Sequence, residues 1–148
     1  MTPLRIALFL FFLFSGFCSL VYQVVWLRLG MASFGVNTAI VSIVLSVFMA
    51  GLAAGSWGAG LWLRRSAASP AAALRAYAAA ELWIGLSAWI VPFGLAAGGR
   101  GLGRLAAGWA SADHFTLAGV WLTVVLLTFC VAMGATIPLA MRTVKESP

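Results

Sequence analysis

The sequence has 148 residues, of which 64% are hydrophobic and only 8% are charged. A soluble domain carries roughly 25% charged residues because its surface faces water, so this composition excludes an ordinary soluble protein and indicates a surface covered by lipid. Nine Lys and Arg against three Asp and Glu give a net charge of +6. Because the basic residues lie between apolar runs, they indicate membrane orientation and contact with lipid headgroups, and not nucleic-acid binding.

Four apolar runs are long enough to cross a bilayer, because about 20 residues of α-helix rise roughly 30 Å. They predict an all-α, polytopic membrane helix bundle in one transmembrane domain, residues 1–148, with spans at residues 6–27, 36–63, 77–97 and 115–141. Six basic residues on one side against three on the other predict that both termini are cytoplasmic. Eight of the nine basic residues are Arg, a bias typical of GC-rich bacterial genomes, so we expect a bacterial inner membrane.

The first span ends in an aromatic and polar cluster. Tyr22 and Trp26, four residues apart, are expected to anchor this helix at the outer membrane interface, just before Arg28. Gln23 is expected to face the protein interior because its amide needs hydrogen-bond partners. Cys18 lies in the same apolar run, and we expect it to be a free thiol, as we do Cys130 in the fourth span.

The second span presents a small residue at every fourth position, which predicts a face for close helix packing. We call this face the α-ridge; its residues are Thr38, Ser42, Ser46, Ala50, Ala54 and Gly58. Gly51 and Gly55 form a GxxxG pair beside it. The occupant of the α-ridge is expected to be another helix of this chain, with a foreign subunit as the alternative.

The third span holds Glu81, the only acidic residue inside a predicted span, about one turn from the cytoplasmic end. A buried carboxylate is costly, so we expect an ion pair with Arg5, Arg64 or Arg65, or a protonated carboxyl; a proton or substrate relay is the alternative. After this span, residues 98–114 predict either a short amphipathic helix on the outer surface or a flexible Gly and Ala loop.

The fourth span contains Pro138, which is expected to kink or end the helix, with Thr136 satisfying a freed backbone group. His114, the only histidine, is expected at its solvated outer start. The sequence shows no second histidine, paired carboxylates, Cys-x-x-Cys or phosphate-binding glycine loop. We therefore expect no catalytic residue, no cofactor and no metal.

Four stretches together resemble the membrane domain of bacterial spermidine-synthase-like membrane proteins, which are described as fused to a major-facilitator-like region. The matching segments, in the family's order, are SGF and LVYQVVWLR within residues 15–28, FMAGLAAGS at 48–56, EL and IGL within 81–86, and MGATIPL at 133–139. The resemblance implies a membrane scaffold. The family's soluble aminopropyltransferase-like domain has no counterpart in these 148 residues, so its catalysis is not carried over.

Three functions fit these features. The first is a non-catalytic accessory subunit of a larger bacterial membrane complex, photosynthetic or respiratory, which it binds through its transmembrane helices. The second is a half-transporter of the major-facilitator-like type, with Glu81 as its coupling group. The third is a membrane anchor for a separate aminopropyltransferase-like enzyme. The expected partners are membrane lipids and other membrane subunits.

Overall fold

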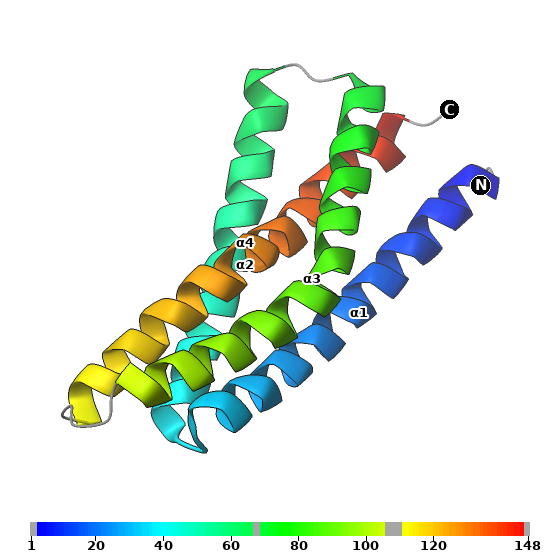
Figure 1. The fold of residues 1–148 in the computed structure, drawn as a ribbon. Coiled ribbons are helices and arrows are strands. Elements are labelled where there is room, and N and C mark those ends of the chain that lie inside the picture. Colours follow the sequence, from blue (N-terminus) through cyan, green and yellow to red (C-terminus); the bar gives the residue numbers. More distant parts are fainter. Residues whose placement is uncertain (1–2, 67–68, 106–110, 147–148) are drawn as a thin grey trace.

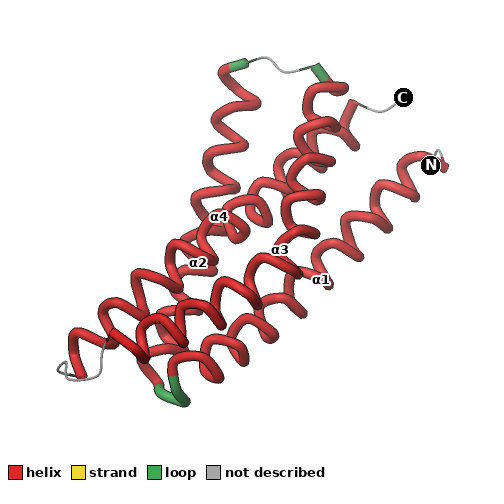
Figure 2. Tube along the Cα trace, in the orientation of Figure 1, coloured by secondary structure: helices red, strands yellow, loops and turns green. Residues whose placement is uncertain are grey.

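The protein, described here from a computed structural model, is a bundle of four long helices. The structure describes residues 3–66, 69–105 and 111–146, without the side chains of 3–5, 7, 8, 70, 105, 111–114 and 144–146. Figure 2 shows helix throughout these ranges except at short turns. The helices are α1 (Pro3–Phe34), α2 (Thr38–Arg65), α3 (Pro70–Leu105) and α4 (Ser111–Glu146).

The helices run alternately up and down, as the four apolar runs predict. Both ends of the chain lie at the same end of the bundle as the α2–α3 connection, and the α1–α2 turn lies at the opposite end (Figure 1). Each helix contains a segment long and apolar enough to cross a membrane: Phe9–Phe34, Thr38–Arg65, Ala71–Arg104 and Phe115–Thr143. The chain is therefore a multi-pass membrane protein by the length and composition of its helices.

The α1–α2 turn is set by two residues. Gly35 has φ +100°, a left-handed conformation that glycine adopts without a Cβ penalty, and its N–H donates to the Met31 carbonyl at 2.9 Å to close α1. Asn37 then caps α2, its side-chain oxygen accepting from the Ala39 N–H at 2.7 Å. A turn this short holds α1 and α2 antiparallel and adjacent at this end.

The closest helix contact is the crossing of α2 and α4, and it is made by glycines from both helices. A Cβ on Gly55 would meet the Val131 backbone carbonyl and stand 2.9 Å from the Ala135 nitrogen. A Cβ on Gly134 would stand 2.7 Å from the Leu52 Cα. Lipid provides no hydrophobic drive for helices to associate, so this backbone-to-backbone approach, with its dispersion contacts, holds α2 on α4.

Pro138 lies inside α4, which continues to Glu146, so the expected helix end at this residue is wrong. The ring removes the N–H that would bond the carbonyl four residues earlier, which belongs to Gly134. That carbonyl instead accepts a hydrogen bond from the Ser56 hydroxyl of α2 at 2.8 Å. Thr136, the expected partner, donates to Met133 at 2.7 Å. The proline thus adds a polar bond to the α2–α4 crossing.

Trp26 is part of the buried core, so its expected role as an interfacial anchor is wrong. Its side chain is only 1% exposed, and its ring lies 5.5 Å from Tyr22 and 6.3 Å from Phe129 of α4, centroid to centroid. Trp83 of α3 stacks on Phe129, with a centroid distance of 5.4 Å. These aromatic rings join α1, α4 and α3 near the middle of the bundle.

The third helix is much longer than the expected span at residues 77–97. Residues 98–105 continue α3 without a break, so the described part of this segment is helical but is not a separate outer helix. Residues 106–110, with Trp109, lie outside the described residues. Two tight contacts hold this extension: Gly98 faces Trp121 of α4, and Gly99 faces Ser33 of α1.

Candidate interaction site in the membrane

The α-ridge of α2 is not covered by any other described helix. All six of its residues are exposed, whereas Gly51 and Gly55, about 100° further around the helix, are buried against α4. The expectation that another helix of this chain occupies the α-ridge is therefore wrong. The physical reason is that α2 packs on α4 through the glycine pair, which turns the α-ridge away from α4.

The chemistry of the α-ridge suits a helix from outside the bundle. Ala50, Ala54 and Gly58 leave the α2 backbone accessible over two turns, which permits close approach by another helix. Ser42 and Ser46 place hydroxyl groups on the same exposed face, and hydroxyls in lipid form hydrogen bonds with a partner helix. The face thus permits close approach by another helix.

Among the described residues, five tryptophans are exposed on the outside of the bundle, and such large rigid groups suit contact with lipid or protein. Trp57, beside the α-ridge, is 73% exposed, and Trp89 of α3 is 71% exposed. Only one of the five, Trp121, has a recorded hydrogen bond, from its ring N–H to the Gly94 carbonyl at 2.9 Å. The exposed set is Trp57, Trp62, Trp83, Trp89 and Trp121.

Glu81 belongs to a polar cluster between α1 and α3. The Ser15 hydroxyl of α1 donates to Glu81 Oε1 at 2.6 Å, and the Tyr77 hydroxyl, one turn earlier on α3, interacts with both. These partners replace Arg64 and Arg65, which end α2 as exposed residues. Because α3 begins at Pro70, Glu81 lies eleven residues into the helix, about 16 Å along its axis, and beyond the reach of those arginines. The Arg5 side chain lies outside the described residues.

We predict that this cluster holds the exposed first half of α1 on the bundle. Replacing Glu81 by glutamine or Ser15 by alanine should each lower the free energy of unfolding by about 1 kcal/mol, since hydrogen bonds inside membranes average about 0.6 kcal/mol with a maximum near 1.7. Unfolding in mixed micelles measures this change. Ser19→Ala is the control, because Ser19 bonds only the carbonyl of Ser15 on its own helix. An equal loss in all three variants would contradict the prediction.

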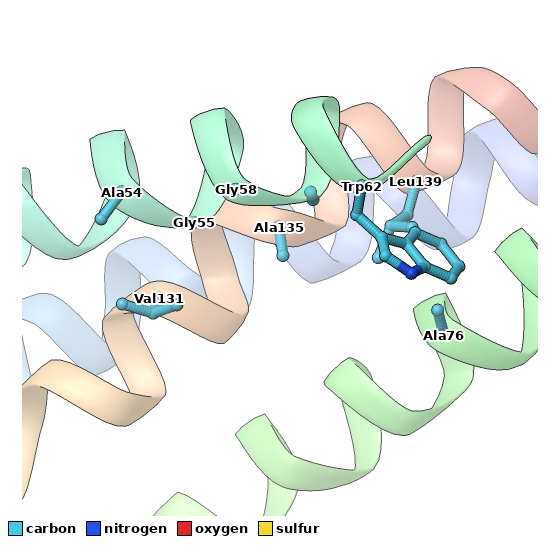
Figure 3. Close-up of a pocket in the computed structure, with 9 residues that line it drawn as sticks. Ala54, Gly55, Gly58, Trp62, Ala76, Val131, Ala135 and Leu139 are labelled. Carbon is cyan, nitrogen blue, oxygen red and sulfur yellow. The ribbon is translucent and has the colours of Figure 1, made fainter. Parts of the chain in front are cut away.

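A groove opens between α2, α3 and α4 at the end of the bundle that carries the chain termini (Figure 3). Its volume is about 320 Å³, and its walls are mostly small side chains. Trp62 lies across its end, with the indole beside Leu139 of α4 and directed toward Ala76 of α3 (Figure 3). Two α-ridge residues, Ala54 and Gly58, form part of its wall. The groove therefore adjoins the α-ridge at this end.

The remaining residues singled out from the sequence are dispersed. Gln23 is half-buried on α1, Arg28 is exposed near the α1–α2 turn, and the His114 side chain lies outside the described residues. Cys18 and Cys130 are free thiols, as expected. Within the described ranges, no three His, Cys, Asp or Glu side chains come together as a metal site would require.

The functional contacts that sequence reasoning missed are the hydroxyls of Ser15 and Tyr77 on Glu81 and that of Ser56 on α4. The spacing of Tyr77 and Glu81, four residues apart on one helix, is a signal that could have indicated the first of these. Comparisons of the chain with protein-family models, with curated proteins and with solved structures find no match.

Proposed function

We propose that this chain is a non-catalytic accessory subunit of a larger bacterial membrane complex, which it binds through the lipid-facing surfaces of its helices. The observation that carries the proposal is the exposed α-ridge. The bundle's own packing uses Gly51 and Gly55, and the six small residues of the α-ridge remain exposed on the described chain. A helix of another subunit that packs closely on the α-ridge accounts for these small residues.

The exposed tryptophans extend the same argument to the rest of the surface. A single ridge accommodates one close neighbour, so further contacts with a complex come from other groups. Trp57 stands next to the α-ridge, and Trp89 projects from α3. Both supply large contact area at little entropic cost, as tryptophans in protein interfaces do.

The orientation that we propose places both termini in the cytoplasm and the protein in the inner membrane. Arg64, Arg65, Arg75 and Arg142 belong to the end of the bundle with the termini, whereas Arg28, Arg100 and Arg104 belong to the other. Positively charged residues favour the cytoplasmic side. In intact cells, a membrane-impermeant thiol reagent should therefore label a cysteine introduced at position 111 but not one at position 69. Labelling at 69 alone would reverse the orientation.

The subunit assignment is tested by the size of the complex. Deleting the gene should leave the main activity of the complex present but lower its mass on native gels. Wild-type protein should restore that mass, and Ala50→Leu should not, because a leucine side chain on the α-ridge keeps a partner helix at a distance. Ala79→Leu is the matched control on the exposed surface of α3. If the protein migrates as a free monomer and no complex loses mass, the assignment is wrong.

The Ser15, Tyr77 and Glu81 cluster favours a second candidate, a half-transporter with Glu81 as its coupling group. Carboxylates within spans, hydrogen-bonded to hydroxyls, occur along proton pathways. The two candidates differ in what Glu81→Gln does. If Glu81 serves only packing, Glu81→Gln leaves any proton-linked flux in proteoliposomes unchanged. If the chain is a transporter, Glu81→Gln abolishes that flux while the protein still assembles. The third function, an anchor for an enzyme, requires that the partner in the native complex be a soluble aminopropyltransferase-like protein.

A further inference from the structure

The groove between α2, α3 and α4 has the dimensions of a single hydrocarbon chain. It runs along α2 from Ala54 to Trp62 and along α4 from Val131 to Leu139, about 12 Å on each helix. A volume of about 320 Å³ over this length corresponds to a mean cross-sectional area of a few tens of Å². An α-helix with its side chains is about 10 Å across and has a cross-sectional area of roughly 80 Å². A transmembrane helix therefore does not fit into the groove.

The walls of the groove are apolar and are not closed by the bundle. α4 lies between α2 and α3 and packs against both, so α2 and α3 diverge on either side of it (Figure 1). Figure 3 shows the resulting hollow, bounded by the small residues of α2 and α4 on one side and by Ala76 of α3 on the other. Its length of about 12 Å along the helices is close to the roughly 15 Å thickness of the hydrocarbon in one leaflet of a bilayer.

Arginines stand at one end of the groove on the helices that line it. Arg65 follows Trp62 by three residues on α2, and Arg142 follows Leu139 by three residues on α4, so each lies about one turn beyond the last apolar lining residue. Arg64 adds a further exposed positive charge at the end of α2. An apolar slot one leaflet deep, ending in arginines, matches an acyl chain joined to an anionic headgroup.

We propose that this groove is a binding site for one anionic phospholipid. One acyl chain lies along Ala54, Gly58 and Ala135, and the phosphate meets the guanidinium groups of Arg65 and Arg142. Arginine suits this contact because its planar fork of donors binds phosphate oxygens in pairs. The lipid fills the divergence between α2 and α3 and so fastens both helices to α4. The groove shares Ala54 and Gly58 with the α-ridge, but lipid binding does not require that the chain be a subunit of a complex.

The binding test uses the full-length protein in mild detergent, with dioleoyl-phosphatidylglycerol and dioleoyl-phosphatidylcholine as probes and native mass spectrometry as the readout. We expect one phosphatidylglycerol to bind in preference to phosphatidylcholine. Arg65→Gln should weaken the phosphatidylglycerol complex about fivefold, which corresponds to about 1 kcal/mol for one basic residue near an anionic headgroup. Arg100→Gln, at the opposite end of α3, is the control and should change nothing.

The acyl-chain part of the site is tested by filling the groove. Gly58→Leu should lower phosphatidylglycerol affinity at least tenfold, because an added Cβ at this groove residue meets open space and the rest of the side chain takes volume from the groove. Gly60→Leu is the matched control: it also has open space, and it does not line the groove. Circular dichroism and thermal unfolding show whether both variants keep the wild-type fold.

A second readout uses tryptophan fluorescence in place of mass spectrometry. Phosphatidylglycerol with brominated acyl chains should quench tryptophan fluorescence in a saturable way, and Trp62→Phe should remove the saturable part. The proposal is overturned if phosphatidylglycerol shows no preference over phosphatidylcholine, if Gly58→Leu binds as the wild type does, or if the saturable quenching survives in Trp62→Phe. The phosphatidylglycerol preference of the wild type and the Arg65→Gln variant do not involve the α-ridge, so failure of the lipid site and failure of the subunit role are separately visible.

Discussion

Gly55→Val is expected to unfold most of the bundle. A side chain at this position meets the backbone of α4 at Val131 and Ala135, and backbone atoms cannot rotate away as a flexible side chain can. Overpacking usually costs about 1–3 kcal/mol, and because here it forces two helices apart along their closest contact, we expect a loss of about 3 kcal/mol or more. Titration with a denaturing detergent, followed by near-UV circular dichroism, measures the loss.

Gly60→Val is the control for this prediction, because it makes the same chemical change on the same helix and its added Cβ meets open space. Valine is slightly more favourable than glycine in a helix, so the control should be neutral or a few tenths of a kcal/mol more stable. Equal losses of stability in the two variants would show that α2 needs glycine for its backbone conformation and not for the close approach of α4.

Trp26→Ala is expected to lower the free energy of unfolding by about 2–3 kcal/mol. Removing a buried Trp from a soluble protein costs about 3–5 kcal/mol, part of which is the transfer of apolar surface from water. A membrane protein lacks that part because its unfolded helices remain in lipid, so the cost that remains is lost dispersion and the cavity beside Phe129.

Trp57→Ala is the matched control, since Trp57 is 73% exposed and Trp26 only 1%. It should change the stability of the isolated protein by less than about 0.5 kcal/mol. The same detergent titration reports both variants, and a further cavity effect should appear as faster unfolding of Trp26→Ala. If Trp57→Ala lowers the stability as much as Trp26→Ala does, the burial of Trp26 is not the cause of the loss.

Hydropathy and helix length predict the four spans, their up-and-down order and the common end of both termini, because the bilayer sets a minimum length that the sequence must meet. The ends of helices are less predictable. Gly98 and Gly99 read as helix breakers, yet they are the points where α3 approaches Trp121 and Ser33. A glycine that loosens a helix in water permits close packing in a membrane, and sequence alone does not separate the two uses.

The candidate site is less predictable than the fold because both environments of a membrane helix are apolar. The α-ridge and the Gly51 and Gly55 pair have the same small-residue signature, but one faces outward and the other faces α4. Burial of Trp26 is hidden for the same reason, since its neighbours would suit lipid equally well. The partners of Glu81 depend on which helix lies beside it, and a lone Ser15 in an apolar run gives no sign of that contact.

The α2–α4 crossing also bears on how the chain is made. The crossing brings Gly55 of α2 and Gly134 of α4 into close contact with the opposite helix, and Gly134 is synthesised 79 residues after Gly55. At 5–20 residues per second, this separation is a delay of roughly 4–16 s. During that interval α1, α2 and α3 enter the bilayer while the glycine face of α2 has no α4 to receive it. Insertion of the individual helices therefore precedes their tightest association, and the nascent chain passes through a stage at which both faces of α2 are open to other helices in the membrane.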